Sequence, residues 1–409
     1  MSYLLKHDNK EFSGFFKISG SKSISNRLLI LKYLFSGITI KNLSNSDDTK
    51  VLEKHLKKSS TTIDIGHAGT AMRFLTAFLA IKEDQQFILM GSERMKKRPI
   101  KILVDSLNKL GSNISYTQKK GYPPIKIKGK KINGGEIILN SNISSQYITA
   151  LILIAPVLKE GLKIFLDGLV TSKPYITMTL SLLSDLGIKN KFEKNIIVIN
   201  PTKKINELIY SVESDWSSLS YYYSIVALSK NSKINVGNFY EKSTQGDRKL
   251  VEIYSKLGVD TKFLKKEGRV ILSKKPGFRS PKKIILHLVD NPDIAQTILV
   301  TCLGLGILCN ISGLHTLKIK ETNRLKAMKN ELKKLGADVK IKSESICLLP
   351  LKRINKNISI NTYDDHRMAM AFSPLALLVP IKIKEPDVVS KSYPNFWKDL
   401  KSINYKITS

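Results

Sequence analysis

The sequence predicts an α/β protein with mixed sheets, assembled from six copies of one repeat. Two recurring patterns support this: an amphipathic helix that ends in Leu-Gly before a short strand, and an apolar helix that opens with a short polar cluster. The composition agrees, since 42% hydrophobic and 25% charged residues are typical of a globular protein with a sizeable core. A length of 409 residues suits two domains.

The Leu-Gly pattern occurs four times, for example as KLGSNISY and KLGADVKI. Its glycines are Gly111, Gly187, Gly258 and Gly336, which lie 76, 71 and 78 residues apart. Each glycine stands where the end of a helix needs a left-handed residue. The segment FWKDLKSINYKI near the C-terminus is interpreted as a fifth copy, with Asn404 in place of glycine.

The second pattern is in phase with the first. Its markers Ala71, Ser144, Ser217, Asp293 and Asp365 follow one another at steps of 73, 73, 76 and 72 residues. From Ser23 to Ala71 the step is only 48, so the first repeat is predicted to be shortened. Three repeats in each of two pseudo-symmetric domains is the natural grouping.

Charge and cysteine content narrow the class of protein. The chain carries 67 Lys+Arg against 34 Asp+Glu, a net charge of +33, but the lysines are spread over its whole length. This favours attraction of small anions over a nucleic-acid-binding role. Three cysteines without metal-ligand spacing predict a reducing compartment and no metal site. Without a signal peptide or a membrane-spanning run, we expect a cytoplasmic protein that binds neither membrane nor nucleic acid.

The repeated helix starts have a chemical consequence. The first turn of a helix has free backbone N–H groups and about half a positive charge. Several such ends that converge between two domains would form a strong anion site. The sequence therefore predicts a phosphorylated or carboxylated substrate in an interdomain cleft.

Candidate anion-binding residues in the N-terminal half lie at predicted helix starts. Lys22 and Ser23 precede Arg27 by about a turn in GSKSISNR, which only half-resembles a phosphate-binding P-loop. Gly69 in HAGTAMR would let a ligand approach the backbone, and Arg98 is held out of the helical region by the proline that follows it. Plain capped or solvated helices are the alternative at each place.

Two further clusters in this half are polar and uncharged. Ser144, Ser145 and Gln146 offer two hydroxyls and an amide at a helix start, which suits a phosphate or sugar-like hydroxyls. Ser172 and Tyr175 belong to a short polar turn before another helix.

The C-terminal half supplies the acids. Asp293 opens an apolar helix, where a carboxylate could cap the helix or act as a general base. Lys320 and Arg324 are expected on one helical face, where a shared anion would relieve their repulsion. The candidates beside them are Glu321, Arg367 and Lys391. For each of these residues alone, a position on a solvated helix face is the alternative. Because the candidates recur at matching phases of the repeat, this alternative is hard to hold for all of them.

The ordered motifs resemble those of the 5-enolpyruvylshikimate-3-phosphate (EPSP) synthase family of enolpyruvyl transferases. The resemblance runs from about residue 14 to 400 and rests on GSKSISNR, AGTAMR, ERMKKRPI, SSQYITAL, SKPYI, KETNRL, DDHRMAMAF and KSYP. The family has two domains of three βαβαββ repeats each. On that pattern we expect a shikimate 3-phosphate domain at 20–212, and a domain at 1–19 and 213–409 with the catalytic acids and the phosphoenolpyruvate side.

The resemblance implies a reaction. The 5-hydroxyl of shikimate 3-phosphate adds to phosphoenolpyruvate, and the tetrahedral adduct then loses phosphate. It implies a monomer that needs no metal or organic cofactor. The catalytic residues would be Asp293 as base, Glu321 as proton donor, and Lys22. The shikimate 3-phosphate site would comprise Lys22, Ser23, Arg27, Ser144, Ser145, Gln146, Ser172, Tyr175, Asp293 and Lys320. The phosphoenolpyruvate site would comprise Lys22, Gly69, Arg98, Arg324, Arg367 and Lys391.

The chain departs from the family pattern at a few positions. His67 and Thr316 stand where the family often has Asn, Ser214 stands where a glycine is expected, and the first repeat lacks roughly 25 residues. The sequence leaves three alternatives open. The related UDP-N-acetylglucosamine enolpyruvyl transferase usually has a reactive Cys in its N-terminal half, whereas no Cys precedes Cys302 here. A basic nucleic-acid-binding module and a non-catalytic remnant are the other two.

Overall fold

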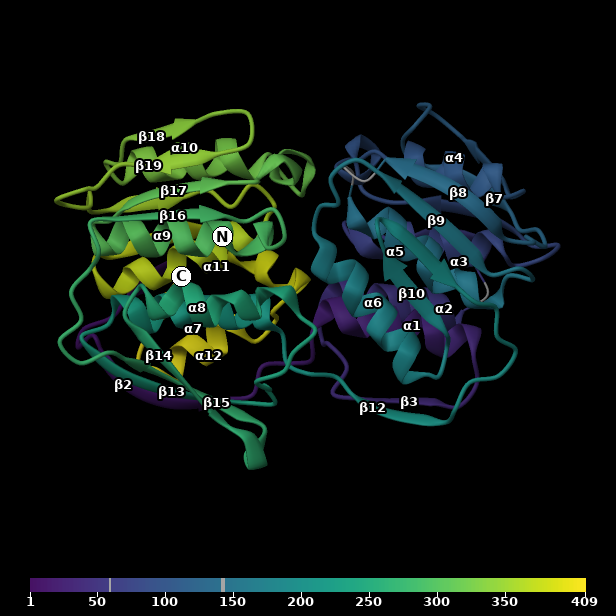
Figure 1. Ribbon diagram of the computed structural model, residues 1–409. Coiled ribbons are helices and arrows are strands. Elements are labelled where there is room, and N and C mark those ends of the chain that lie inside the picture. The colour runs from purple at the N-terminus through teal and green to yellow at the C-terminus, as the bar shows by residue number, and fades with distance from the viewer. Residues whose placement is uncertain (59, 141–143) are drawn as a thin grey trace. The chain divides into compact units, whose positions relative to one another are not determined.

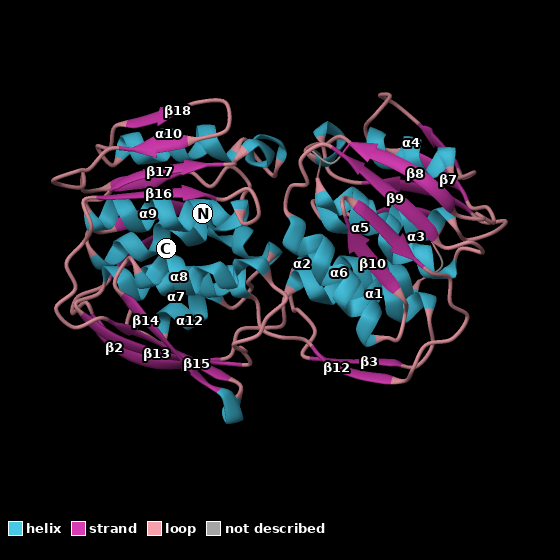
Figure 2. Cartoon of the chain, in the orientation of Figure 1, coloured by secondary structure: helices cyan, strands magenta, loops and turns pink. Residues whose placement is uncertain are grey.

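The structure is a computed structural model that describes residues 1–58, 60–140 and 144–409. The chain forms two compact units, an N-terminal unit at Gly20–Val212 and a C-terminal unit that combines Met1–Ser19 with Glu213–Ser409 (Figures 1 and 2). The chain therefore passes from one unit to the other twice. No helix in the described part of the chain is long and apolar enough to cross a membrane.

The elements of the N-terminal unit are short. Its helices are α1 (Lys22–Leu34), α2 (Asp47–Lys57), α3 (Gly69–Ala80), η1 (Met95–Lys97), α4 (Lys101–Lys109), α5 (Ser145–Ile154), η2 (Ala155–Val157) and α6 (Lys173–Asp185). Its strands are β3 (Ile38–Lys41), β4 (Thr62–Asp64), β5 (Gln86–Met90), β6 (Asn113–Tyr116), β7 (Ile125–Lys128), β8 (Gly135–Asn140), β9 (Leu162–Asp167), β10 (Asn190–Glu193), β11 (Ile196–Ile199) and β12 (Leu208–Ser211).

The C-terminal unit repeats the same alternation. Its helices are α7 (Trp216–Leu228), η3 (Gly246–Lys249), α8 (Leu250–Ser255), η4 (Lys265–Glu267), η5 (Pro292–Ile294), α9 (Ala295–Leu305), η6 (His315–Ile319), α10 (Arg324–Lys334), α11 (His366–Phe372), η7 (Ser373–Leu377), η8 (Pro386–Lys391) and α12 (Phe396–Lys401). Its strands are β1 (Ser2–Lys6), β2 (Glu11–Phe16), β13 (Asn231–Gly237), β14 (Val259–Leu264), β15 (Arg269–Lys274), β16 (Lys283–His287), β17 (Leu308–Ser312), β18 (Val339–Ile341), β19 (Ile346–Leu348), β20 (Ile358–Ile360), β21 (Ile381–Lys384) and β22 (Lys406–Thr408).

One sheet topology recurs in both units. In the sheet β4-β5-β7-β6 the first pair of strands is parallel and the other two pairs are antiparallel, and helices α3 and α4 follow the first two strands. Four other sheets share this order: β8-β9-β11-β10, β16-β17-β19-β18, β2-β13-β15-β14 and β20-β21-β1-β22. The predicted α/β class with mixed sheets is confirmed.

The first repeat is shortened, as the 48-residue step predicted. Its described sheet has two strands, β12 and β3, which pair in parallel. The parallel pair of this repeat is thus present, whereas the antiparallel pair that completes the other five sheets does not occur among the residues described for this repeat.

Left-handed residues end the amphipathic helices as predicted. Gly111, Gly187, Gly258 and Gly336 all have positive φ, between 78° and 102°, and Asn404 has φ 68°. After four of these five helices the residue that follows the left-handed one donates back into the last turn, as in the bond from Ser112 N to Leu107 O at 3.0 Å. These bonds satisfy carbonyls that the helix end would leave unpaired.

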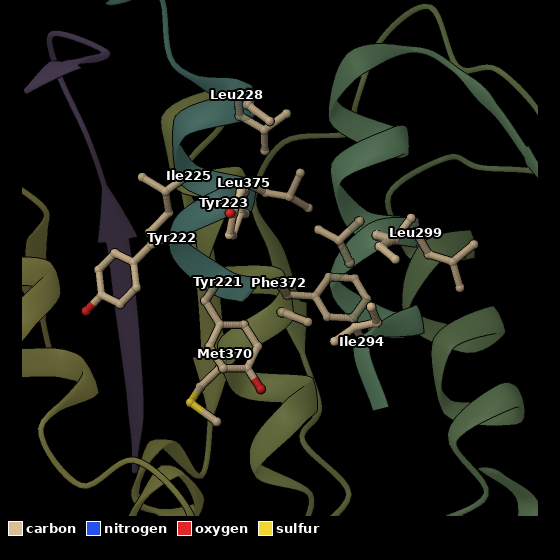
Figure 3. Packing of buried hydrophobic residues seen from close by; sticks show 14 of the residues in the cluster. Tyr221, Tyr222, Tyr223, Ile225, Leu228, Ile294, Leu299, Met370, Phe372 and Leu375 are labelled. Atoms are coloured by element: carbon tan, nitrogen blue, oxygen red, sulfur yellow. The ribbon is translucent and has the colours of Figure 1, made fainter. Parts of the chain in front are cut away.

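Each unit has its own hydrophobic core, built around its most apolar helices. In the C-terminal unit α7, α9 and α11 pack together, and the consecutive residues Tyr221, Tyr222 and Tyr223 of α7 are all buried (Figure 3). In the N-terminal unit α1, α3 and α5 pack in the same way. Strands such as β7 alternate buried and exposed residues, so one face of the sheet covers the helices and the other faces solvent.

Candidate active site

Arg324 is the centre of a charged cluster in the C-terminal unit. Its side chain is 2% exposed and donates hydrogen bonds to three carboxylates. Nε bonds Asp365 Oδ2 at 2.7 Å, Nη1 bonds Asp293 Oδ1 at 2.8 Å, and Nη2 bonds Glu321 Oε2 at 2.8 Å. One guanidinium therefore holds both predicted acid/base residues.

Three more predicted cations surround these acids. Lys320 Nζ lies 3.5 Å from Asp293 Oδ1, and Arg367 Nη2 lies 3.5 Å from Asp293 Oδ2. Arg367 Nη1 also donates to the Asp293 carbonyl at 3.1 Å. Lys391 Nζ lies 3.3 Å from Glu321 Oε1. The six candidates named above for this half, Asp293, Lys320, Glu321, Arg324, Arg367 and Lys391, thus belong to one cluster.

The helix starts bring these residues together. Asp293 lies in the 3-10 turn η5 that leads into α9, Arg324 is the first residue of α10, and Asp365 is the N-cap of α11, where it accepts from Arg367 N at 2.9 Å. The expectation that Lys320 and Arg324 share a helical face is wrong. Lys320 is extended, with φ −77° and ψ −153°, and precedes α10, which begins only after the N-cap Asn323.

The cations decide the charge state of Asp293. Burial alone would raise the pKa of this carboxyl, but Lys320, Arg367 and Arg324 outweigh burial and hold the pKa well below its usual range. Burial lowers the pKa of Lys320, and Asp293 opposes that shift in part. Asp293 is therefore a carboxylate at neutral pH, next to an ammonium group that releases its proton more readily than usual.

Asp247 is a buried acid near this cluster that the sequence analysis missed. It lies in η3 and accepts a short hydrogen bond from the Ser217 hydroxyl at the start of α7. Burial, with a further contribution from the charge of Asp293, raises the pKa of Asp247 to about 6, although Arg367 opposes the shift. No motif marks this residue, because only the fold places it near Asp293.

In the N-terminal unit, the predicted site residue Lys22 also lies at a helix start. It is the first residue of α1, and its Nζ lies 3.3 Å from Asp48 Oδ2. Asp48 is 4% exposed and lies in the first turn of α2. Asp48 is the second residue that the sequence analysis missed, since its partner lies 26 positions earlier in the chain.

Arg27 lies deeper than Lys22 and Ser23. It is 3% exposed, and its guanidinium donates to Ser23 O at 2.7 Å and Thr179 Oγ1 at 2.8 Å. The same group lies 5.8 Å from the ring centre of Tyr175. These contacts tie α1 to α6, so Arg27 has a packing role, and its contact with a substrate stays a prediction.

Gly69 and Arg98 are in close contact. A Cβ atom on Gly69, the first residue of α3, would lie 2.3 Å from Arg98 Nη1. Arg98 is 7% exposed and extended, with φ −97° and ψ 122°, as predicted for the residue before a proline. Any side chain at position 69 would have to displace this guanidinium.

The polar trio lies at the start of α5. Ser144 is the predicted N-cap, and its hydroxyl accepts from Gln146 N at 3.4 Å. The Gln146 amide donates to Thr70 Oγ1 of α3 at 3.4 Å, so the starts of α3 and α5 are adjacent. Ser145, between Ser144 and Gln146, is buried. Ser172 precedes α6 in a left-handed conformation, with φ 54°. The unit therefore gathers a cation, hydroxyls and an amide at neighbouring helix starts.

These two clusters have the chemistry of an enzyme that handles phosphorylated, carboxylated substrates, and comparison with known proteins names the family. Residues 51–400 match the family model of EPSP synthase (3-phosphoshikimate 1-carboxyvinyltransferase). The chain belongs to the EPSP synthase family. It is thus an enzyme of the transferase class, as the motifs indicated, and the comparisons support the EPSP synthase family over the UDP-N-acetylglucosamine enolpyruvyl transferase alternative.

Named EPSP synthase relatives align along almost the whole chain. The 3-phosphoshikimate 1-carboxyvinyltransferase of Bacteroides fragilis (strain YCH46) is 42% identical over 417 aligned positions, which cover 100% of this chain and 99% of that protein. The enzyme of the same name from Buchnera aphidicola subsp. Cinara cedri is 37% identical and covers 95% of this chain. The solved EPSP synthase of Acinetobacter baumannii matches at a TM-score of 0.78 and 21% identity over 100% of both chains, which confirms the two-domain fold.

Two positions that differ from the EPSP synthase pattern have distinct surroundings. His67 Nδ1 lies 2.9 Å from Ser92 Oγ in an exposed setting. Thr316 is 7% exposed, and its hydroxyl has no hydrogen-bond partner among the described residues. No group of three or more His, Cys, Asp or Glu that could hold a metal ion occurs within residues 1–58, 60–140 and 144–409.

Proposed function

We propose that this chain transfers the enolpyruvyl group of phosphoenolpyruvate to the 5-hydroxyl of shikimate 3-phosphate, in the shikimate pathway to chorismate and the aromatic amino acids. The hydroxyl oxygen bonds to the central carbon of the enol while the methylene carbon gains a proton. The resulting tetrahedral adduct then loses a proton from the new methyl group together with phosphate. The products are the enolpyruvyl ether and inorganic phosphate.

The observation that carries this proposal is the shared guanidinium of Arg324, which lies 2.8 Å from both Asp293 and Glu321. An addition–elimination of this kind needs a base near the hydroxyl and an acid near the methylene carbon, at a fixed distance from each other. We assign the base to Asp293 and the proton donor to Glu321. Arg324 fixes the spacing of the two carboxylates.

Substrate binding would change the basicity of Asp293. In the free protein its neighbouring cations Lys320, Arg324 and Arg367 favour the carboxylate, which makes it a weak base. When the anionic groups of a substrate occupy those cations, their pull on Asp293 weakens and its pKa rises. The base would thus become effective only when phosphoenolpyruvate is present.

The remaining assignments follow the family pattern. For shikimate 3-phosphate we propose Lys22, Ser23, Arg27, Ser144, Ser145, Gln146, Ser172, Tyr175, Asp293 and Lys320. For phosphoenolpyruvate we propose Lys22, Gly69, Arg98, Arg324, Arg367 and Lys391. These residues are supported by the preference of phosphate and carboxylate for helix starts, guanidinium and ammonium groups. We further propose a cytoplasmic monomer that is active without a metal or organic cofactor.

The test is phosphate release from purified protein mixed with both substrates. We expect release that requires both, survives dialysis against a chelator, and falls by about 100-fold or more in Asp293→Asn and Glu321→Gln. Asp260→Asn and Glu252→Gln, exposed acids outside the site, are the matched controls and should retain wild-type rates. Release that both site variants retain would overturn the acid/base assignment, and no release from folded wild type would overturn the proposed reaction.

A further inference from the structure

The loop between β20 and α11 has an unusual backbone. Tyr363 and Asp364 are consecutive non-glycine residues in the left-handed region, with φ 56° and 54°. Each such residue costs about 1–3 kcal/mol and persists only where its surroundings hold it. This loop leads directly into Asp365 and Arg367, two members of the charged cluster.

Glu331 of α10 holds this loop. Its side chain is fully buried, and its two oxygens accept three hydrogen bonds. Oε1 accepts from the Tyr363 hydroxyl at 2.6 Å, and Oε2 accepts from Asn361 N at 3.0 Å and Lys334 Nζ at 2.6 Å. Two of the three donors belong to the loop itself, and charge-assisted bonds of this kind are among the stronger ones in proteins. The carboxylate thus fixes both backbone and side chain of the loop.

The loop transmits this constraint to the cluster. Asp365 N donates to Thr362 O at 2.9 Å, which closes the turn before α11. The Asp365 carboxylate then accepts from Arg324 Nε at 2.7 Å. Arg324 and Glu331 lie seven residues, about two turns, apart on α10 and so share one face of the helix. One face of α10 therefore contacts the loop at two points, through Glu331 at Tyr363 and through Arg324 at Asp365.

We propose that Glu331, acting through Tyr363, is a positioning residue of the active site. It fixes the left-handed loop, the loop places Asp365, and Asp365 orients the guanidinium of Arg324 that holds the two acid/base residues. Glu331 lies outside the charged cluster and contacts no proposed substrate group. Its catalytic meaning rests on the proposed function, whereas its effect on loop geometry does not.

The first variant is Tyr363→Phe, which removes the hydroxyl bond to Glu331 and keeps the ring. Tyr254→Phe is the matched control, because it removes another tyrosine hydroxyl bond of the same unit, to Thr301 Oγ1 at 2.9 Å, between two residues that are not members of the charged cluster. We expect Tyr363→Phe to lower kcat by about 10-fold with KM for shikimate 3-phosphate changed less than about twofold. Tyr254→Phe should lower the unfolding midpoint and leave kcat unchanged.

Two variants of Glu331 test the carboxylate itself. Glu331→Gln keeps an acceptor for Asn361 N and a polar partner for the Tyr363 hydroxyl, so kcat should fall by no more than about threefold. Glu331→Leu keeps the approximate volume without acceptors and should lose at least as much activity as Tyr363→Phe. If Glu331→Gln and Glu331→Leu behave alike while both stay folded, the proposed positioning role is wrong.

A second readout needs no substrate. Amide hydrogen exchange in the free protein should become faster over residues 361–367 and 320–326 in Tyr363→Phe, but not in Tyr254→Phe. Exchange at wild-type rates in both segments would overturn the inference even if kcat changed. If wild type releases no phosphate, the proposed function fails, and the exchange comparison still decides whether Glu331 and Tyr363 position the cluster.

Discussion

Two buried carboxyl groups of the C-terminal unit show how neighbours set the charge of a residue. Asp293 is surrounded by Lys320, Arg367 and Arg324, which keep its pKa well below the ordinary value despite burial. For Asp247, burial and the negative charge of Asp293 both raise the pKa, and they outweigh Arg367 and the hydrogen bond from Ser217. The pKa of Asp247 therefore rises to about 6. Near neutral pH one group therefore stays ionised while the other titrates.

This contrast makes a prediction for stability. Folded Asp247 keeps its proton up to about pH 6, whereas an ordinary Asp releases it near 3.8. The folded state binds more protons in this window, so the free energy of unfolding falls as pH rises through it, by about 3 kcal/mol in all. We expect Asp247→Asn, which cannot ionise, to remove this fall. Urea unfolding of both proteins at about pH 4.5 and pH 7.5 measures the difference.

The control is Asp260→Asn, an exposed acid of the same unit, which should follow wild type at both pH values. Asp215, Asp293 and Arg367 also act on Asp247, so the comparison must be the difference between variant and wild type, not the slope of either alone. A difference that is equal at both pH values would show that Asp247 does not titrate in this window.

For single residues, the sequence predicted which side chains belong to the candidate site better than it predicted the contacts between them. Motifs identified Asp293, Glu321 and the cations around them, because these types recur at the helix starts of each repeat. Asp247 and Glu331 carry no such mark. Each acts through partners from other segments, Ser217 for Asp247 and Tyr363 for Glu331, and only the fold brings those segments together.

Helix ends are the elements that the sequence predicted most directly. A glycine after an amphipathic helix marks a left-handed cap because other residues have a Cβ that disfavours positive φ. The glycines of all four copies adopt that conformation, and Asn404 does so in the fifth. Strand pairing was not predictable in this way. The parallel contact of β2 with β13 joins segments about 220 residues apart, and no local signal specifies it.

Gly111 offers a clean test of the cap. Its φ is 102°, and a Cβ built on it would meet no atom within 4 Å, so substitution adds backbone strain without a collision. We expect Gly111→Ala to lower the free energy of unfolding by about 1–2 kcal/mol, with the m-value and kcat unchanged. Ser115→Ala, at an exposed position of the strand that follows this helix, is the control. A loss below about 0.5 kcal/mol would indicate that the helix end relaxes to another conformation.

One element was predicted wrongly for a physical reason. Lys320 and Arg324 have the spacing of neighbours on a helix, but α10 begins only at Arg324. Asn323 caps the helix by accepting from Lys326 N at 3.2 Å, so the chain before it is free to stay extended. Lys320 and Glu321 therefore lie in the loop before α10, from which Lys320 contacts Asp293 and Glu321 contacts Arg324. An N-cap residue inside KETNR was the signal that the helical interpretation overlooked.

At the scale of the whole molecule, the shortened first repeat retains the helix start that carries proposed substrate contacts. The two-stranded sheet of β12 and β3 keeps the parallel pair, and β3 directly follows α1, which begins with Lys22 and carries Arg27. Within the described residues this repeat has no antiparallel pair of the kind that the other five sheets have. The shortening therefore spares the helix start that carries the proposed substrate contacts.

The net charge of +33 is a property of the whole molecule with two opposing effects. Mutual repulsion of the lysines, such as Lys126 and Lys128 on β7 and Lys382 and Lys384 on β21, destabilises the compact state. The same field draws anionic substrates toward the protein. Salt screens both over a Debye length of about 10 Å at 0.1 M. Raising NaCl should therefore increase the urea midpoint and also raise KM for both proposed substrates.

A variant with fewer surface charges distinguishes screening of the general charge repulsion from binding of a salt ion at one specific site. Replacing Lys126, Lys128, Lys382 and Lys384 by Gln lowers the charge on the exposed faces of two strands that carry no candidate site residue. We expect a higher urea midpoint at low salt and a shallower increase with NaCl, with kcat unchanged. A midpoint that does not depend on NaCl in wild type would mean that the folded chain tolerates its charge without cost. Tight, steeply salt-dependent binding of a random-sequence DNA duplex would instead revive the nucleic-acid alternative, because phosphate neutralisation releases counterions.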